Sequence, residues 1–138
     1  MAEALRVIVK PAPRLARALR NLKEPRIRRV FTRALIRSAL DVQTEAASNQ
    51  IIRSSKGPVD AVRVTSRTGT LRRSIAVNRQ DLPFAITIGS DLIYAPVHEF
   101  GSRKRNIPAR PFLGPALDAV APRFERHFLT ELRKASDG

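Results

Sequence analysis

The chain has 138 residues and a mass of 15.4 kDa, about the length of one domain, and 43% of its residues are hydrophobic but only 5% aromatic. It contains no cysteine, which excludes disulfides, thiolate zinc sites and cysteine nucleophiles. Its net charge is +14, and residues 1–79 hold 18 cations against 5 anions. Such a charge attracts polyanions and predicts a protein that acts near nucleic acid or an acidic partner. The alternative interpretation of the net charge is that arginine is simply frequent on solvent-exposed faces of helices.

The N-terminal segment, residues 1–24, predicts an extended arm followed by a short helix. The arm contains the alternating apolar residues Leu5, Val7 and Val9, and Pro11 closes the run. We interpret these three residues as an inter-subunit arm that adds a strand to a neighbour's sheet. A short helix is expected from Pro13 to about Leu22, because proline suits the first helical turn.

Residues 25–53 predict a long helix, since their apolar residues recur at steps of three and four and no glycine or proline interrupts them after Pro25. Ser54–Pro58 is a cluster of helix-breaking residues and predicts a loop.

Residues 59–101 predict a small antiparallel sheet of three or four strands. The expected strands are Val62–Thr65, Ser74–Val77, Phe84–Ile88 and Leu92–Ala95. Asp81, Leu82 and Pro83 predict a hairpin connection between the second and third strands. The fold class is therefore α+β, in which a long helix in the N-terminal half packs on a small antiparallel sheet and a C-terminal helix closes a single domain.

Residues 102–114 form a basic, proline-rich loop, and residues 115–135 predict a C-terminal helix kinked near Pro122. A plain connection rarely needs more than ~6 residues, which favours a preformed projection over a mere connector. The candidate contacts to DNA or a partner are Arg103, Lys104, Arg105 and Arg110. The candidate anchors of the loop are Phe100, Ile107, Phe112 and Leu113.

The sequence offers little catalytic chemistry. The only histidines, His98 and His127, lie far apart without metal-ligand spacing, and no glycine-rich phosphate loop is present. His98 and Glu99 are adjacent, and on a strand adjacent side chains point to opposite faces. We therefore interpret them as a local hydrogen-bonded cluster and expect neither enzymatic activity nor a metal or cofactor.

Four segments in order resemble one known family. They are Thr68–Ile75 (TG-x-L-x-x-S-I), Ile88–Ser90, Tyr94–Gly101 (Y-A-x-x-x-E-F-G) and Ile107–Ala116 (P-x-R-P-F-L). Together they are similar to the neck and tail-completion proteins of tailed bacteriophages, also called virion morphogenesis or minor tail proteins. Pro122 within the final helix and residues 1–24 depart from that pattern.

The resemblance implies a structural virion protein without enzymatic activity, assembled in the host cytoplasm into a hexameric or dodecameric ring at the head–tail neck. Its expected partners are copies of itself, the adjacent connector, tail-terminator or tail-tube proteins, and double-stranded DNA passing the channel, with no membrane.

Two other classes of function stay open. One is a free-standing basic nucleic-acid-binding module, which the net charge suggests. The other is a small toxin-like or processing enzyme that uses His98 and Glu99.

Overall fold

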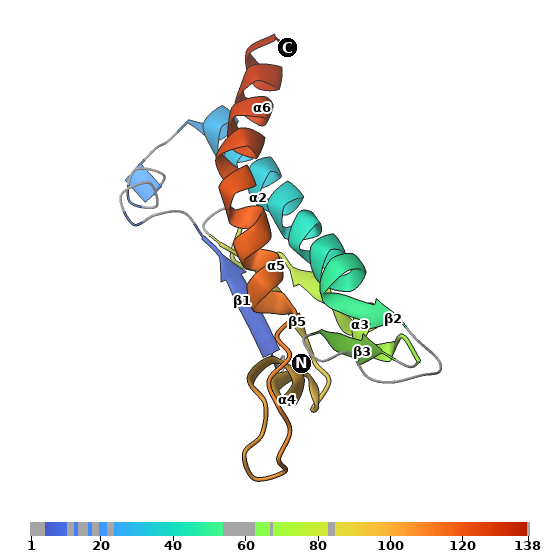
Figure 1. Ribbon diagram of the computed structural model, residues 1–138. Coiled ribbons are helices and arrows are strands. Elements are labelled where there is room, and N and C mark those ends of the chain that lie inside the picture. Colours follow the sequence, from blue (N-terminus) through green and yellow to red (C-terminus); the bar gives the residue numbers. More distant parts are fainter. Residues whose placement is uncertain are drawn as a thin grey trace.

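A three-stranded sheet and a pair of long helices make up the body of the protein (Figure 1). The structure is a computed structural model, and it describes residues 5–10, 13, 17, 20–21, 24–53, 63–66, 68–82 and 85–137. The predicted loop at 54–58 and most of the predicted helix at 13–22 lie outside these residues. The α+β fold predicted from the sequence is confirmed.

The sheet has the strand order β1–β5–β4 and is antiparallel throughout, with β1 at Leu5–Val9, β4 at Ala76–Asn78 and β5 at Ile86–Ser90. The central strand β5 is buried along its whole length. Val7 and Val77 both lie opposite Ile88, so the apolar residues of the three strands share one face of the sheet.

The interpretation of Leu5, Val7 and Val9 as an inter-subunit arm is wrong for this structure. The three residues belong to β1, which pairs with β5 of the same chain, from Leu5 opposite Ser90 to Val9 opposite Ile86. The alternation correctly predicted a strand, but this strand pairs with another strand of the same chain and buries Leu5 in the core.

The long helix α2 runs from Pro25 to Glu45 and continues through a π-helical turn, Ala46–Gln50. Glu24 caps its first turn, because its Oε1 accepts a hydrogen bond from the Arg26 amide at 3.1 Å. The predicted helix extended to residue 53, but Ile51–Arg53 forms the strand β2 instead. The two β-branched isoleucines at its start favour the extended conformation.

The predicted strand around Val64 also pairs differently from expectation. The strand β3 (Val64–Ser66) lies parallel to β2, with Ile51 opposite Val64, and forms a second, separate sheet. The short helix α3 (Thr70–Ser74) follows, so Ser74 ends a helix rather than beginning a strand.

The predicted strand at Leu92–Ala95 is a turn that leads into the helix α4 (Ala95–Phe100). Pro96 lies in the first turn of α4, where its missing N–H costs no hydrogen bond. Asn78 and Ile86 end and begin a β4–β5 hairpin, in which Leu82 N donates to Arg79 O at 3.3 Å.

The C-terminal helix begins at Leu113, two residues before the predicted start. It consists of α5 (Leu113–Val120), a 3₁₀ turn at Ala121–Arg123 that contains Pro122, and α6 (Phe124–Asp137). The helix α6 runs back along α2 in the opposite direction (Figure 1). Phe31 of α2 meets the rings of Phe124 and Phe128 edge to face, at centroid distances of 5.5 and 5.7 Å. Among the described residues, no helix has the length and apolar character that a membrane span requires.

Candidate functional site

The predicted loop is a hairpin that projects from the end of the molecule where α4 lies, remote from the C-terminus (Figure 1). We call residues 102–111 the cationic hairpin. Ser102 and Ile107 exchange two backbone hydrogen bonds of 2.8 Å, and Asn106 N donates to Arg103 O at 3.2 Å. Asn106 closes the turn with a φ of 54°, a conformation that asparagine tolerates. The projection therefore has a defined backbone conformation.

Gly101 fixes the direction in which the cationic hairpin leaves α4. Its φ is 75°, and a Cβ at this position would lie 2.8 Å from Ala109 N and 2.9 Å from Ile107 O. Both neighbours are backbone atoms, so no side-chain movement could make room. On the returning arm, Arg110 N donates to His98 O at 2.7 Å. These contacts hold the two arms together at the foot of the hairpin.

Glu99 ties the end of the cationic hairpin to the helix that follows it. Its Oε2 accepts hydrogen bonds from Phe112 N at 2.7 Å and Leu113 N at 3.0 Å, and its Oε1 accepts one from Gly114 N at 2.8 Å. These amides belong to the first turn of α5, which lacks partners of its own and favours a negative charge. Only 8% of Glu99 is exposed, so the carboxylate is a buried cap that docks α4 against α5.

This arrangement gives Glu99 a structural task and separates it from His98. No contact between their side chains is found in the described part of the chain, and both residues lie in α4 rather than on a strand. Burial, together with the positive charge of Arg110, lowers the pKa of His98 below its ordinary 6.5. The Tyr94 ring stands at 90° to the imidazole at a centroid distance of 5.7 Å. The described residues gather no group of three potential metal ligands.

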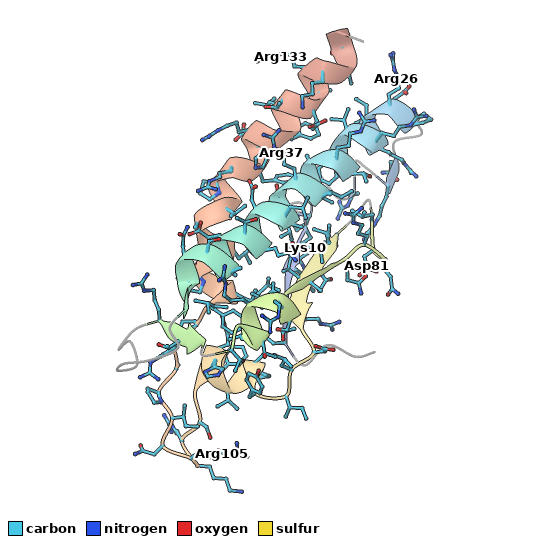
Figure 2. The ribbon with its side chains drawn as sticks, turned by 90° about the vertical axis from the view of Figure 1, so that its right-hand side faces the viewer. Lys10, Arg26, Arg37, Asp81, Arg105 and Arg133 are labelled. Carbon is cyan, nitrogen blue, oxygen red and sulfur yellow. The ribbon has the colours of Figure 1, made fainter. Side chains whose placement is uncertain are left out.

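The predicted contact residues divide into a tip and a base. Arg103, Lys104 and Arg105 are exposed at the tip of the cationic hairpin, and Figure 2 shows Arg105 at that extremity of the molecule. Arg110 is half-buried at the base, and its buried Nε has no hydrogen-bond partner among the residues that the structure describes. The three tip residues are thus available for a partner, whereas Arg110 belongs to the foot of the hairpin.

The predicted anchors also divide. Phe112 and Leu113 are completely buried in the core, and Ile107 is half-buried. Phe100 does not anchor the loop, because 72% of it is exposed. The last turn of the short helix α4 turns Phe100 outward, whereas Glu99 beside it turns inward.

Sequence reasoning missed an exposed apolar group beside the cationic hairpin. We call Ile93, Tyr94 and Phe100, which are 91%, 42% and 72% exposed, the α4 apolar patch. Phe100 also lines a cavity of about 560 Å³ on the hairpin, together with Arg103 and Ile107. A strand at Leu92–Ala95 would bury alternate side chains, so the sequence-based prediction gave no reason to expect this patch.

The remaining motif residues carry hydrogen bonds within the fold. The Oγ atoms of Ser74 and Ser90 lie 2.7 Å apart, Ser74 Oγ donates to Leu71 O at 2.7 Å, and Leu92 N donates to Ser90 Oγ at 3.2 Å. The first two motifs therefore meet each other through these serines, just as the last two meet through Glu99.

Comparison with known proteins gives one short similarity. The chain is 57% identical over 35 residues to "Uncharacterized protein MJ0331" of Methanocaldococcus jannaschii, a match that covers 25% of this chain and 26% of that protein. The chain thus matches about a quarter of that relative's length. No family model matches the chain, and no solved structure matches it.

Proposed function

We propose that the protein is a structural subunit of a tailed-bacteriophage virion, which forms a ring at the head–tail neck and joins or finishes the tail while letting DNA pass. The observation that carries this proposal is the cationic hairpin, a projection whose conformation is fixed before any partner binds. Fixing a loop in advance reduces the ordering entropy lost on association, which favours a docking element.

The composition of this end of the molecule supports a protein partner for the cationic hairpin. Exposed apolar residues that lie together mark interaction surfaces, and interface centres are enriched in aromatic residues and arginine. The α4 apolar patch and the three cations at the hairpin tip supply both kinds of contact. We expect the partner, an adjacent ring, to present carboxylates around an apolar centre.

A ring suits a subunit of this size. In a closed ring, every copy contacts one neighbour through one patch and its other neighbour through a second, different patch. A contact that is weak between two copies is therefore repeated around the ring. The order of the four sequence motifs supports the same assignment through the family that they resemble. The structure adds that Glu99, Gly101, Ser74 and Ser90, which belong to those motifs, serve the fold.

The test replaces Arg103, Lys104 and Arg105 together with serine in the phage and scores tailed, infectious particles. As a matched control, three arginines that are exposed in β1, in the turn after β4 and in the 3₁₀ turn, namely Arg6, Arg79 and Arg123, are replaced with serine. We expect the hairpin variant to fold normally but to give few infectious particles, and the control to assemble well. Normal yields from the hairpin variant, or absence of the protein from purified particles by electron microscopy, would overturn the proposal.

A second candidate function, a free-standing nucleic-acid-binding module, is favoured by the net charge of +14. Such a module would bind DNA tightly as an isolated monomer. A neck subunit instead needs its ring, and its single copies bind DNA weakly. Sedimentation of the purified protein with and without DNA distinguishes the two.

A further inference from the structure

Four arginines form a line on one face of α2. Arg26, Arg29, Arg33 and Arg37 follow one another at steps of three and four residues. At 3.6 residues per turn they fall within an arc of about 80° and extend over about 16 Å. We call these four residues the α2 arginine stripe. Figure 2 shows Arg26 at the end of α2 remote from Arg105, with Arg37 farther along the helix.

The α2 arginine stripe faces away from the core. All four residues are exposed, whereas the opposite face buries residues such as Phe31 and Leu35. Arg37 lies 4.0 Å from Glu131 of α6, and Lys134 lies 3.4 Å from the same carboxylate. The side chains of Arg26, Arg29 and Arg33 have no ion pair within the described residues.

This arrangement is unfavourable in the free protein. Like charges four residues apart repel on a helix, as in the pairs Arg29–Arg33 and Arg33–Arg37. The Glu24 carboxylate caps the first turn of α2 through the Arg26 amide, but it leaves the repulsion along the stripe in place. A bound polyanion would remove that repulsion.

We infer that the α2 arginine stripe binds the phosphate backbone of double-stranded DNA without reading its sequence. Phosphates follow one another every ~3.4 Å along the axis of each strand, so the stripe spans roughly five of them. Guanidinium groups bind phosphate oxygens through two parallel hydrogen bonds. The stripe has no aromatic neighbour on its own face, and it ends at the exposed Leu40. It thus lacks the apolar centre that marks the hairpin end as a protein contact.

This inference deepens the proposed function, because it assigns DNA to α2 and leaves the neighbouring ring to the cationic hairpin. The experiment uses the full chain and a mixed-sequence DNA duplex of about 20 base pairs, two helical turns. Affinity is measured from about 50 to 200 mM salt. The stripe variant carries Arg26→Gln, Arg29→Gln and Arg33→Gln, and the matched control carries Arg6→Gln, Arg79→Gln and Arg123→Gln.

Four phosphate contacts predict that the unmodified protein loses about 100-fold in affinity over this salt range, and the single contact left in the stripe variant predicts a loss of about 4-fold. The control should keep the steep salt dependence, and an unrelated duplex of the same length should bind equally. Circular dichroism checks that α2 remains helical in the variants.

The inference is overturned if the stripe variant keeps the salt dependence of the unmodified protein. It is also overturned if the hairpin variant of Arg103, Lys104 and Arg105 loses as much DNA affinity as the stripe variant, or if polyglutamate binds the stripe as tightly as DNA, which would make it a protein contact. Failure here leaves ring assembly untouched. Conversely, DNA binding that depends on the stripe in a protein absent from virions would refute the proposed function alone.

Discussion

The cationic hairpin and the α2 arginine stripe are both rich in positive charge, but they differ in what surrounds that charge. At the hairpin, the exposed Phe100 lines a cavity together with Arg103, and Ile93 and Tyr94 are exposed just before the same helix. On α2, four arginines stand in a regular row with no apolar companion until Leu40. Charge with an apolar centre suits a protein interface, whereas regularly spaced charge alone suits a phosphate backbone.

The two regions also owe their shape to different interactions. The stripe is carried by a helix whose inner face is packed into the core through Phe31, Leu35 and Val42. The cationic hairpin depends on a handful of polar contacts at its foot, above all those of Glu99 and Gly101. Single substitutions should therefore disturb the hairpin strongly and the stripe only weakly, and the four predictions below test this difference.

The largest effect is expected for Glu99→Ala. This change leaves the amides of Phe112, Leu113 and Gly114 without their acceptor and should lower the free energy of unfolding by about 3–5 kcal/mol. Denaturant unfolding measures this loss. Glu99→Gln keeps one acceptor oxygen, so its free energy of unfolding should lie between those of the original protein and the Ala variant. An Ala variant as stable as the original protein would show that the cap does not hold the hairpin.

Gly101→Ala should lower the free energy of unfolding by about 2–3 kcal/mol, because the new Cβ meets the backbone of Ile107 and Ala109 at a residue with a positive φ. The matched control is Gly69→Ala, which has a similar φ of 79° but whose Cβ would lie 2.8 Å from the guanidinium of Arg73, the far end of a flexible side chain. We expect thermal unfolding to show a clearly smaller loss for the control. Equal losses would contradict the argument that backbone contacts fix the hairpin.

A smaller effect is expected from pH. Because the pKa of folded His98 lies below 6.5, the unfolded chain takes up its proton first as the pH falls. The contribution of neutral His98 to stability is therefore present above pH 6.5 and is lost as the pH falls through the folded pKa. Unfolding measured between about pH 7 and pH 5 should show a decline that His98→Gln reduces. Arg110→Gln should raise the His98 pKa in an NMR titration, and an unchanged value would remove Arg110 as a cause.

The smallest effect has the opposite sign. Arg33→Gln removes two like-charge pairs from α2 and should raise stability by about 0.5 kcal/mol at low salt, with no gain at high salt. The same change should weaken DNA binding. A loss of stability at low salt would show that the α2 arginine stripe is not under electrostatic strain in the free protein.

The sequence predicted those parts of the fold whose signal is local. The apolar periodicity of α2, the break at Pro122 and the strand-like alternation of Leu5–Val9 all appear in the structure. The loop at 102–114 was recognised as a projection from its prolines and cations. Phe112 and Leu113 stood out as the large apolar residues beside it.

What the sequence did not predict depends on partners distant in the chain or on competing local signals. The parallel pairing of β2 with β3 is not visible in either segment alone. Leu92–Ala95 has the composition of a strand, but Pro96 is equally a helix-start signal, and that signal decides the structure. The outward position of Phe100 and the cap formed by Glu99 both follow from that helix. The sequence therefore indicated the projection at 102–114 but not the exposed apolar residues that precede it.

The pairing of β1 with β5 has a consequence for biosynthesis. Leu5 leaves the ribosome 85 residues before Ser90, the residue opposite it in the sheet. Contacts between residues so distant in the sequence form slowly. Until then β1 is an apolar strand with both edges open, a state prone to aggregation. Overproduction at reduced temperature, which slows translation and association alike, should raise the soluble yield.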